Sequence, residues 1–404
     1  MNNKSQPNPN NPHHSIPTPS EIVAHLDQYI IGQDEAKRTL ACACYFHLHS
    51  CAMVVSSDEY VWPDNHTLIA GPSGTGKSEL IRTICAYLGV PSYQIDCTGL
   101  TPNGYKGRGI DAVITDLEQT MVQDDDSTPP FVVSWDEIDK LWDDGSDAGR
   151  YRRMTQADAL KLIEGGKVSV NLNASRILHV ACGAFDGMEK IRFPADPPQI
   201  GFNSAISLTK ANATHNIKAE HFIKAGLIPE LVGRFSRFTA TNPLNRSDMM
   251  HIMLTSKISF FRRKIEQLER HGIRLVFSDE AVDELAGMAL SHPSGARGLR
   301  QLITQALAPW DFRLAELVAS GVHEIRFDRQ AIHDGTKARL IMGTTEPLPT
   351  TRIFGSKPNE AAKPSEDDEV PLIFWLNRKI YGLFRVREGH QVDDIVRFAN
   401  ARSS

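Results

Sequence analysis

The sequence between positions 71 and 78 is Gly71-Pro72-Ser73-Gly74-Thr75-Gly76-Lys77-Ser78, a complete G-x-x-x-x-G-K-S loop. The apolar run Thr67–Ala70 precedes it, and apolar residues at helical spacing follow it as far as Gly89. A phosphate-binding loop needs a strand before it and a helix after it. Its glycines let backbone N–H groups turn toward phosphates, and the helix N-terminus adds partial positive charge. The loop therefore predicts a bound nucleoside triphosphate, with Lys77 at the β- and γ-phosphates and Ser78 on Mg²⁺.

The alternative, a glycine-rich turn with a chance lysine, is disfavoured because all eight positions and both flanks agree with the motif. An acidic pair, Asp136-Glu137, follows the mostly apolar run Phe131–Trp135. Such a pair alone is ordinarily a solvated loop. Downstream of a phosphate loop, it predicts Asp136 in the Mg²⁺ shell and Glu137 polarising the attacking water.

Strand and helix patterns alternate through the first half of the chain. Short apolar or alternating runs at 67–70, 93–97, 131–135 and 177–181 predict strands. The segment Thr18-Pro19-Ser20-Glu21 is a capping box with Pro at the first helical position, so we expect the first helix to begin there. Strands that alternate with helices indicate an α/β fold, a parallel sheet covered by helices.

The pattern changes near Thr241-Asn242-Pro243, beyond which the chain is mostly helical. Helices are predicted over 249–268 and 301–320, a short strand over 273–277, and Ser278 as the N-cap of another helix. We therefore expect a disordered tail over 1–19, an ATP-binding large domain over 20–242 and a small helical domain over 243–343. A linker is expected over 344–369, and a C-terminal extension of unknown role over 370–404.

Composition narrows the class of protein. At roughly 100–200 residues per domain, the 404 residues allow two or three domains. Lys plus Arg number 44 against 49 Asp plus Glu, a balance that argues against non-specific binding to nucleic acid. Six cysteines are too few for a disulfide scaffold and favour the cytoplasm. The N-terminus lacks the apolar core of a signal peptide.

One helix-length segment needs a choice between alternatives. The longest uncharged run lies between Arg38 and Asp58, and its histidines and small residues favour a buried helix over a membrane span. On that helix Cys44, His47 and Cys51 share one face, which invites a metal interpretation. A fourth ligand cannot be placed, so a core helix is preferred.

Three further stretches have specific patterns. Gly104-Tyr105-Lys106-Gly107 places an aromatic residue between glycines, Gly226–Arg234 ends an apolar turn with one arginine, and Ser294–Arg300 opens a helix. Singly, each has an ordinary explanation: an exposed tyrosine, a surface arginine, a basic helical turn. In this order, from about Glu21 to Gly343, they resemble the ClpX family, the AAA+ unfoldase subunits of the Clp protease.

The resemblance begins at Ile30-Ile31-Gly32-Gln33-Asp34-Glu35-Ala36-Lys37, where the family contacts adenine. It implies that ATP is the nucleotide and that Ile31 lies at the base. It also implies Tyr105 as the pore-loop aromatic, Arg234 as the arginine finger acting on the neighbouring subunit's ATP, and Arg297 as the sensor-2 arginine. A homohexameric ring that acts on protein substrates is the implied assembly.

The tripeptide Ile200-Gly201-Phe202 stands in a polar stretch that indicates a long loop. ClpX-like proteins carry Ile-Gly-Phe here to dock on the ClpP peptidase, so the resemblance implies docking. Apolar anchors at a loop tip can insert into pockets, and a ring of such loops would gain from avidity. The alternative is that Ile200 and Phe202 fold back onto the domain.

Departures from the family are equally informative. The first 41 residues contain no Cys, so we expect the family's N-terminal zinc-binding domain to be absent. The second pore-loop segment is more basic, at Arg150–Arg153, than the family pattern, and Lys106 replaces the usual aliphatic residue. No Asn marks a sensor-1 position. The expected function is ATP-driven unfolding with delivery to ClpP; the alternative is a ClpP-independent remodelling or regulatory ATPase acting on a dedicated partner.

Overall fold

The computed structural model describes residues 16–53, 65–105, 107–121, 129–169, 172–192, 217–292, 295–342, 369–376 and 379–387. The predictions for the N-terminal tail up to residue 15, for Lys106, for Ile200-Gly201-Phe202 and for residues 344–368 lie outside these ranges. The chain forms two compact units, residues 1–348 and 349–404.

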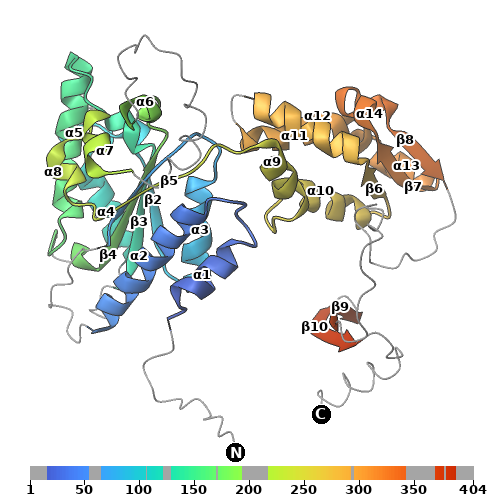
Figure 1. Cartoon of the computed structure of the whole chain (residues 1–404), viewed down its shortest axis with the longest axis horizontal. Helices are drawn as coiled ribbons and strands as arrows, with labels where there is room; N and C mark the ends of the chain where they lie inside the picture. The colour runs from blue at the N-terminus through green and yellow to red at the C-terminus, as the bar shows by residue number, and fades with distance from the viewer. Residues whose placement is uncertain are drawn as a thin grey trace, which may run out of the picture. The chain divides into compact units, whose positions relative to one another are not determined.

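A five-stranded parallel sheet is the centre of the part of the first unit that spans residues 19–240 (Figure 1). Its strands, in the order β2-β3-β4-β1-β5, are Ser92–Asp96, Phe131–Asp136, Ile177–Gly183, Thr67–Ala70 and Arg237–Ala240. Asp136 of β3 is in register with Asp96 of β2 and with Cys182 of β4. Because the strands are parallel, their carboxyl ends bring these side chains to the same edge of the sheet.

Helices cover both faces of the sheet, as the alternating strand and helix pattern predicted. One face packs on α1, α2 and α3, which are Pro19–Leu26, Asp34–Met53 and Lys77–Leu88. The other packs mainly on α4, α5, α7 and α8, which are Ile110–Met121, Asp147–Ile163, Ala219–Lys224 and Pro229–Val232. Residues of β3 alternate between these cores, with Phe131, Val133 and Trp135 on one side and Val132 on the other. A short helix, α6, spans Met188–Arg192.

The predicted helix boundaries in this region are confirmed by their caps. Thr18 caps α1 with Pro19 at the first position, and Glu21 completes the capping box. Gly89 ends α3 in the left-handed conformation, which a residue without Cβ adopts at little cost. Helix α2 is buried along the face that carries Cys44, His47 and Cys51.

A second core belongs to a mostly helical region, residues 244–342, which we call the helical region. Its helices α9 to α14 are Arg246–Leu254, Phe260–Glu269, Asp279–Ser291, Ala296–Phe312, Leu314–Ala319 and Arg329–His333. They pack with a sheet of β6, β7 and β8, which are Arg274–Phe277, Val322–Phe327 and Arg339–Met342. Ser278 caps α11, as predicted. The part of the first unit from α1 to β5 is called the sheet region below.

Two predicted helices were wrong as single elements. The helix expected over 249–268 divides into α9 and α10, because Ser259 caps α10 and bonds the carbonyl of Met253 at 2.6 Å. The helix expected over 301–320 divides into α12 and α13 at Arg313. The alternating strand predicted to reach Cys97 ends at Asp96, where Asp96 caps a short 3₁₀ turn.

The second unit contains an antiparallel hairpin of β9 (Glu369–Leu376) and β10 (Lys379–Arg387). The register pairs Glu369 with Arg387 and Leu376 with Lys379, with an irregularity between Ile380 and Gly382. This hairpin falls in the C-terminal extension, for which the sequence predicted no element.

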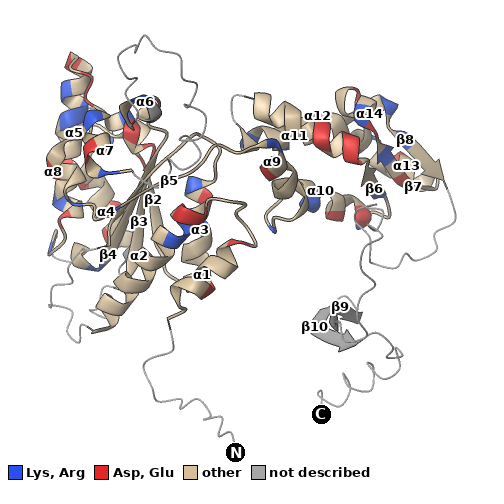
Figure 2. Ribbon diagram, viewed as in Figure 1, with Lys and Arg blue, Asp and Glu red and all other residues tan. Residues whose placement is uncertain are grey.

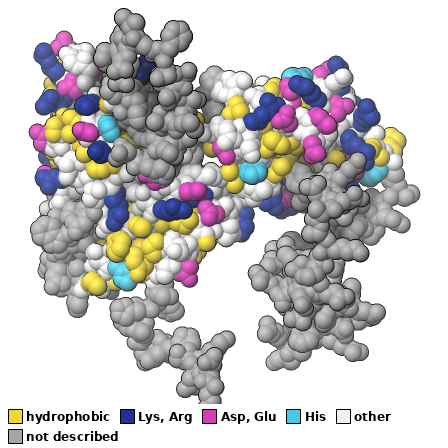
Figure 3. All heavy atoms as spheres, viewed as in Figure 1, with side chains coloured by type: hydrophobic (Ala, Val, Ile, Leu, Met, Phe, Trp, Pro, Cys, Tyr) yellow, Lys and Arg dark blue, Asp and Glu magenta, His cyan; other side chains and the backbone are white. Residues whose placement is uncertain are grey.

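The described surface carries charges of both signs. Figure 2 shows basic residues along α5. Of these, Arg150 forms an ion pair with Asp147 at 3.5 Å, and Arg153 forms one with Asp143 at 3.6 Å. On the face drawn in Figure 3, basic and acidic side chains are interspersed. Among the described residues, no helix combines the length and apolarity needed to cross a membrane.

Three buried histidines are His47 of α2, His66 just before β1 and His179 of β4. The His179 ring accepts a hydrogen bond from the indole N–H of Trp135 at 3.0 Å, and the His179 backbone N–H donates to His66 Nδ1 at 3.2 Å. The Nε2 atoms of His66 and His47 approach the carbonyls of Ile163 and Arg176, both at 3.2 Å. Burial lowers the pKa of His47 to about 4 and of His66 to about 3, and it holds the pKa of His179 well below its ordinary value.

These histidines predict a loss of stability in acid. Below an ordinary histidine pKa of about 6.5, the unfolded chain binds protons that the folded chain does not, so the free energy of unfolding falls as pH falls. Each imidazole contributes at most about 1.4 kcal/mol per pH unit. We expect the melting temperature to drop between pH 6.5 and 4.5, and His47→Gln to reduce that slope. His271→Gln, at an exposed position, is the control; equal slopes in all three proteins would contradict the prediction.

Candidate functional site

The loop between β1 and α3 has the backbone that phosphate binding requires. Gly71, Gly74 and Gly76 have φ values of 153°, 78° and 92°, which residues with a side chain rarely adopt. Gly76 precedes α3 without any side-chain cap. The first N–H groups of α3 are therefore available to an anion at the helix N-terminus.

Lys77 begins α3 and is 9% exposed. Its Nζ donates to the carbonyls of Gly71 at 2.5 Å and Pro72 at 2.9 Å, so the ammonium group lies over its own loop. Burial lowers the pKa of Lys77, and the carboxylates of Asp139 and Asp136 oppose that shift. A buried ammonium held only by neutral carbonyls favours the arrival of an anionic ligand.

Asp136 is the centre of a polar cluster at the carboxyl edge of the sheet. Ser78 Oγ donates to its Oδ2 at 2.9 Å, and Gln94 Nε2 donates to the same oxygen at 2.8 Å. Cys182 Sγ donates to Oδ1 at 3.2 Å. Burial raises the pKa of the Cys182 thiol, so it stays protonated and acts as a donor. A cavity of about 220 Å³ opens on Ser78, Gln94, Asp136 and Cys182.

Glu137 follows Asp136 at the surface in a left-handed conformation, with φ 56° and ψ 39°. Its backbone N–H donates to Asp136 Oδ1 at 3.1 Å. A residue other than glycine in this region carries a strain of about 1–3 kcal/mol, which is found most often at functional sites. The left-handed conformation of Glu137 ends β3 directly after Asp136, so the two carboxylates are neighbours at the end of the strand.

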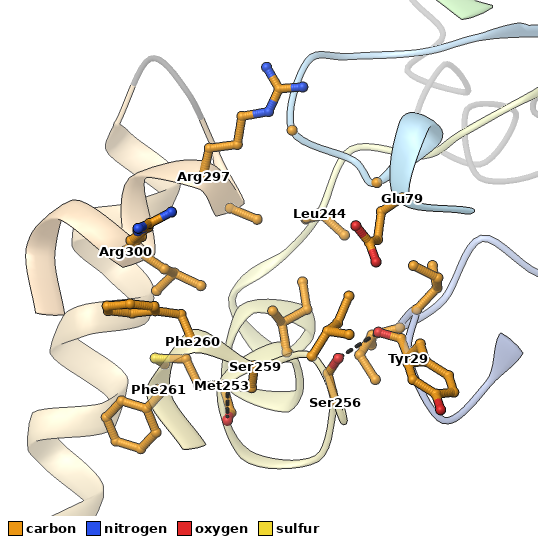
Figure 4. A pocket seen from close by; sticks show the side chains of 18 of the residues that line it. Tyr29, Glu79, Leu244, Met253, Ser256, Ser259, Phe260, Phe261, Arg297 and Arg300 are labelled. Carbon is orange, nitrogen blue, oxygen red and sulfur yellow. Dashed lines mark hydrogen bonds between the residues drawn. The ribbon is translucent and has the colours of Figure 1, made fainter. Parts of the chain in front are cut away.

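A second cavity, of about 470 Å³, lies between the phosphate loop and the helical region (Figure 4). Its lining includes Ile31 from the loop before α2, Gly74 and Gly76 from the phosphate loop, and Leu244 beyond β5. Arg297 stands in the first turn of α12, and Figure 4 shows its side chain extending toward the phosphate loop. Arg300 lies over the ring of Phe260, with Cζ 5.3 Å from the centroid.

The structure thus brings one group of the predicted residues together. The loop residues 71–78, Asp136 and Glu137 share the carboxyl edge of the sheet, and the loop meets Ile31 and Arg297 at the larger cavity. Arg234 is not among the residues that line it. Arg234 follows α8, is 47% exposed, and forms an ion pair with Glu164 at the end of α5.

Tyr105 lies in a different loop, between β2 and α4. It is 51% exposed, and its ring meets Tyr151 of α5 edge-on, with centroids 5.0 Å apart. Asp158 of α5 accepts from the N–H of Asn103 at 2.9 Å and so anchors the loop. Ile200, Gly201 and Phe202 lie outside the described residues.

Sequence reasoning missed Gln94 and Cys182, both of which contact Asp136. Cys182 lies near the carboxyl end of β4, and parallel strands place these ends along one edge, which was the available signal for Cys182. Gln94 lies in the middle of β2 and gave no such signal. Gln33 was noted only as part of a motif. Its side chain holds the backbone of Asn242 in the connection to the helical region.

Two family models match the chain. Residues 67–191 match the ATPase family associated with various cellular activities (AAA), and residues 244–326 match the C-terminal, D2-small domain of ClpB protein. The first match contains the phosphate loop and the acidic pair. The second contains Arg297 and covers most of the helical region.

Curated relatives share about a third of their residues with this chain. The ATP-dependent Clp protease ATP-binding subunit ClpX of Bacteroides fragilis is 34% identical over 310 residues, which cover 71% of this chain and 75% of the relative. Its counterpart in Bacteroides thetaiotaomicron is 33% identical over the same shares. That of Porphyromonas gingivalis is 32% identical over 322 residues, 74% of this chain and 78% of the relative.

Proposed function

The chain belongs to the ClpX family of AAA ATPases, and on that basis we propose that it unfolds and translocates protein substrates at the expense of ATP. The observation that carries the proposal is the junction of two features. A complete phosphate loop with its acidic pair lies at the sheet edge, and a cavity joins that loop to Arg297 of the helical region. A nucleotide bound at this junction would lie where its hydrolysis can change the orientation of the two regions.

The residues at the sheet edge fit ATP with Mg²⁺. Ser78 and Asp136 offer a hydroxyl and a carboxylate 2.9 Å apart, the hard oxygen ligands that Mg²⁺ prefers. The protonated Cys182 thiol is no competitor as a ligand. We propose that the phosphate loop and Lys77 bind the phosphates, that Ser78 and Asp136 hold Mg²⁺, and that Glu137 activates water. Magnesium would neutralise charge on the β- and γ-phosphates.

The apolar wall of the larger cavity suits a purine base. Ile30, Ile31 and Leu244 line it, and such apolar side chains can pack on the faces of the base. We place adenine there, with Arg297 toward the phosphates. Residues 20–242 and 243–343 then act as the large and small domains of the ATPase, with the nucleotide between them.

The assembly we propose is a homohexameric ring. Arg234 is away from the cavity of its own chain and half-exposed, as a residue that serves a neighbouring subunit must be. Tyr105 is exposed on a loop anchored to α5, which supports a role in gripping polypeptide in the central pore. None of the six cysteines forms a disulfide, in keeping with action in the cytoplasm.

We further propose that the ring delivers substrates to a ClpP-type peptidase through Ile200-Gly201-Phe202. This follows from family membership and from the apolar anchors in a polar stretch. If the peptidase is not the partner, the ring acts as an independent remodelling ATPase on a dedicated partner.

Phe202→Ala tests this partnership. Removal of an aromatic anchor typically costs about 2 kcal/mol or more, and avidity multiplies the loss around a ring. We expect ATP hydrolysis and unfolding of a tagged substrate to persist, while proteolysis by added ClpP is lost. Ser204→Ala, in the same stretch, should retain all three activities.

Two outcomes would change the conclusion. If the unaltered protein unfolds substrates yet supports no proteolysis by ClpP, the independent remodeller becomes the better assignment. If Phe202→Ala abolishes ATP hydrolysis, the phenylalanine belongs to the core and the docking proposal is wrong.

A further inference from the structure

The segment that joins the sheet region to the helical region, residues 241–245, is held by two loops of the nucleotide site. The first is the phosphate loop. Thr241 and Thr75 share a hydrogen bond between their hydroxyls at 2.7 Å, and Thr75 also donates to the carbonyl of Pro72 at 2.8 Å. Both threonines are buried.

Gly71 makes this contact possible. A Cβ at Gly71 would lie 2.0 Å from Thr241 Oγ1, so only glycine lets the segment pass this close to the phosphate loop. The Thr241 N–H also donates to the carbonyl of Ala70 at 2.8 Å, which continues the pairing of β1 with β5. A movement of the phosphate loop would therefore also move Thr241, the first residue of the segment 241–245.

The second loop precedes α2 and contributes Gln33. The Gln33 amide makes two hydrogen bonds with the Asn242 backbone: Nε2 donates to the carbonyl at 2.9 Å, and Oε1 accepts from the N–H at 2.7 Å. Gln33 is 5% exposed and has a φ of 61°, an uncommon conformation for a residue with a side chain. Gln33 is therefore buried, has a strained backbone, and holds both the N–H and the carbonyl of Asn242. Such a residue fixes the position of the backbone that it contacts.

Further contacts tie the same loop to the helical region. Ser256 Oγ donates to the Tyr29 carbonyl at 2.5 Å, and the Lys257 N–H donates to the Gln28 carbonyl at 2.9 Å. Tyr29 and Ser256 both line the larger cavity (Figure 4). The ties at 28–29 and at Gln33 therefore lie on either side of Ile31, the residue placed at the base.

We propose that Gln33 is a positioning residue for ATP hydrolysis: its clamp on the Asn242 backbone sets the orientation of the helical region and so the approach of Arg297 to the phosphate loop. Gln33 does not line the cavity, so it acts through the connection and not through contact with the nucleotide. A nucleotide that shifts the phosphate loop moves Thr241, while Gln33 holds the next residue. The inference depends on ATP hydrolysis by this chain and is independent of the peptidase partnership.

The test compares Gln33→Met with Asn242→Ala in the full-length chain. Methionine keeps the length and backbone preference of glutamine but makes neither hydrogen bond. Asn242→Ala keeps the backbone N–H and carbonyl that Gln33 contacts. Coupling between sites typically amounts to about 5- to 150-fold. We expect Gln33→Met to lower kcat by a factor within that range and to leave the Kd for a non-hydrolysable ATP analogue unchanged. We expect Asn242→Ala to match the parent protein in both quantities.

A double variant separates positioning from a structural role. If Gln33 acts through Arg297, the variant Gln33→Met/Arg297→Ala should turn over no more slowly than Arg297→Ala alone. Additive losses would overturn the inference. So would an unchanged kcat in Gln33→Met, or a loss confined to KM and Kd. If Gln33→Met does not fold, Gln33→Glu, which keeps the acceptor for the Asn242 N–H and loses the donor, takes its place in the same measurements.

Discussion

Replacing Glu137 by Gln leaves ATP bound and lowers its turnover by about 10²–10⁴-fold, the usual contribution of a positioned general base. The amide has the size of the carboxylate but cannot polarise the attacking water. Glutamine also has the same backbone preference, so the left-handed turn at φ 56° is retained. The Asp136 cluster with Ser78 and Gln94 does not depend on the Glu137 side chain. We therefore expect nucleotide affinity to survive.

Two measurements on one preparation decide the matter, steady-state ATP hydrolysis and equilibrium binding of ATP. Glu316→Gln, a 72% exposed carboxylate in α13, is the matched control and should hydrolyse ATP normally. Turnover near that of the parent protein in Glu137→Gln would remove Glu137 from the catalytic role. Loss of binding together with turnover would show that the side chain supports the site and not the chemical step.

The phosphate loop and the acidic pair were predictable because each is contiguous in sequence. The eight residues 71–78 carry their own glycines, their own lysine and both flanking elements, so no distant contact is needed to recognise them. Asp136 and Glu137 were predictable for a related reason, since a buried parallel strand ends at the edge where ligands bind. The parallel sheet and the capping box of α1 likewise depend on local pattern.

What the sequence did not predict depends on contacts between distant residues. Gln94 and Cys182 meet Asp136 only through the register of β2, β3 and β4, which no local pattern specifies. Gln33 and Asn242 are 209 residues apart. The break between α9 and α10 combines the local cap at Ser259 with a distant contact, because Ser256 bonds Tyr29 across the two regions while apolar spacing continues through the break.

Arg234→Ala is expected to reduce ATP hydrolysis by about 10³–10⁵-fold, the contribution of an arginine supplied by a neighbouring subunit. The Arg234 guanidinium pairs with Glu164 of its own chain and does not line its own nucleotide cavity. Nucleotide affinity of the single subunit should therefore be preserved. Arg313→Ala, at an exposed arginine of the helical region, is the control and should be active.

Mixing experiments determine whether Arg234 acts between subunits. Lys77→Ala subunits are expected to hydrolyse no ATP themselves, because they lack the lysine that we propose binds the phosphates, but they carry an intact Arg234. Arg234→Ala subunits carry an intact Lys77 and Glu137. In a mixed ring, some interfaces place an intact nucleotide site against an intact arginine, so hydrolysis should reappear although each parent variant is inactive. The rescue should depend on the mixing ratio and vanish when assembly is prevented. If no ratio restores activity while both variants still assemble, Arg234 does not act on the nucleotide of a neighbouring subunit.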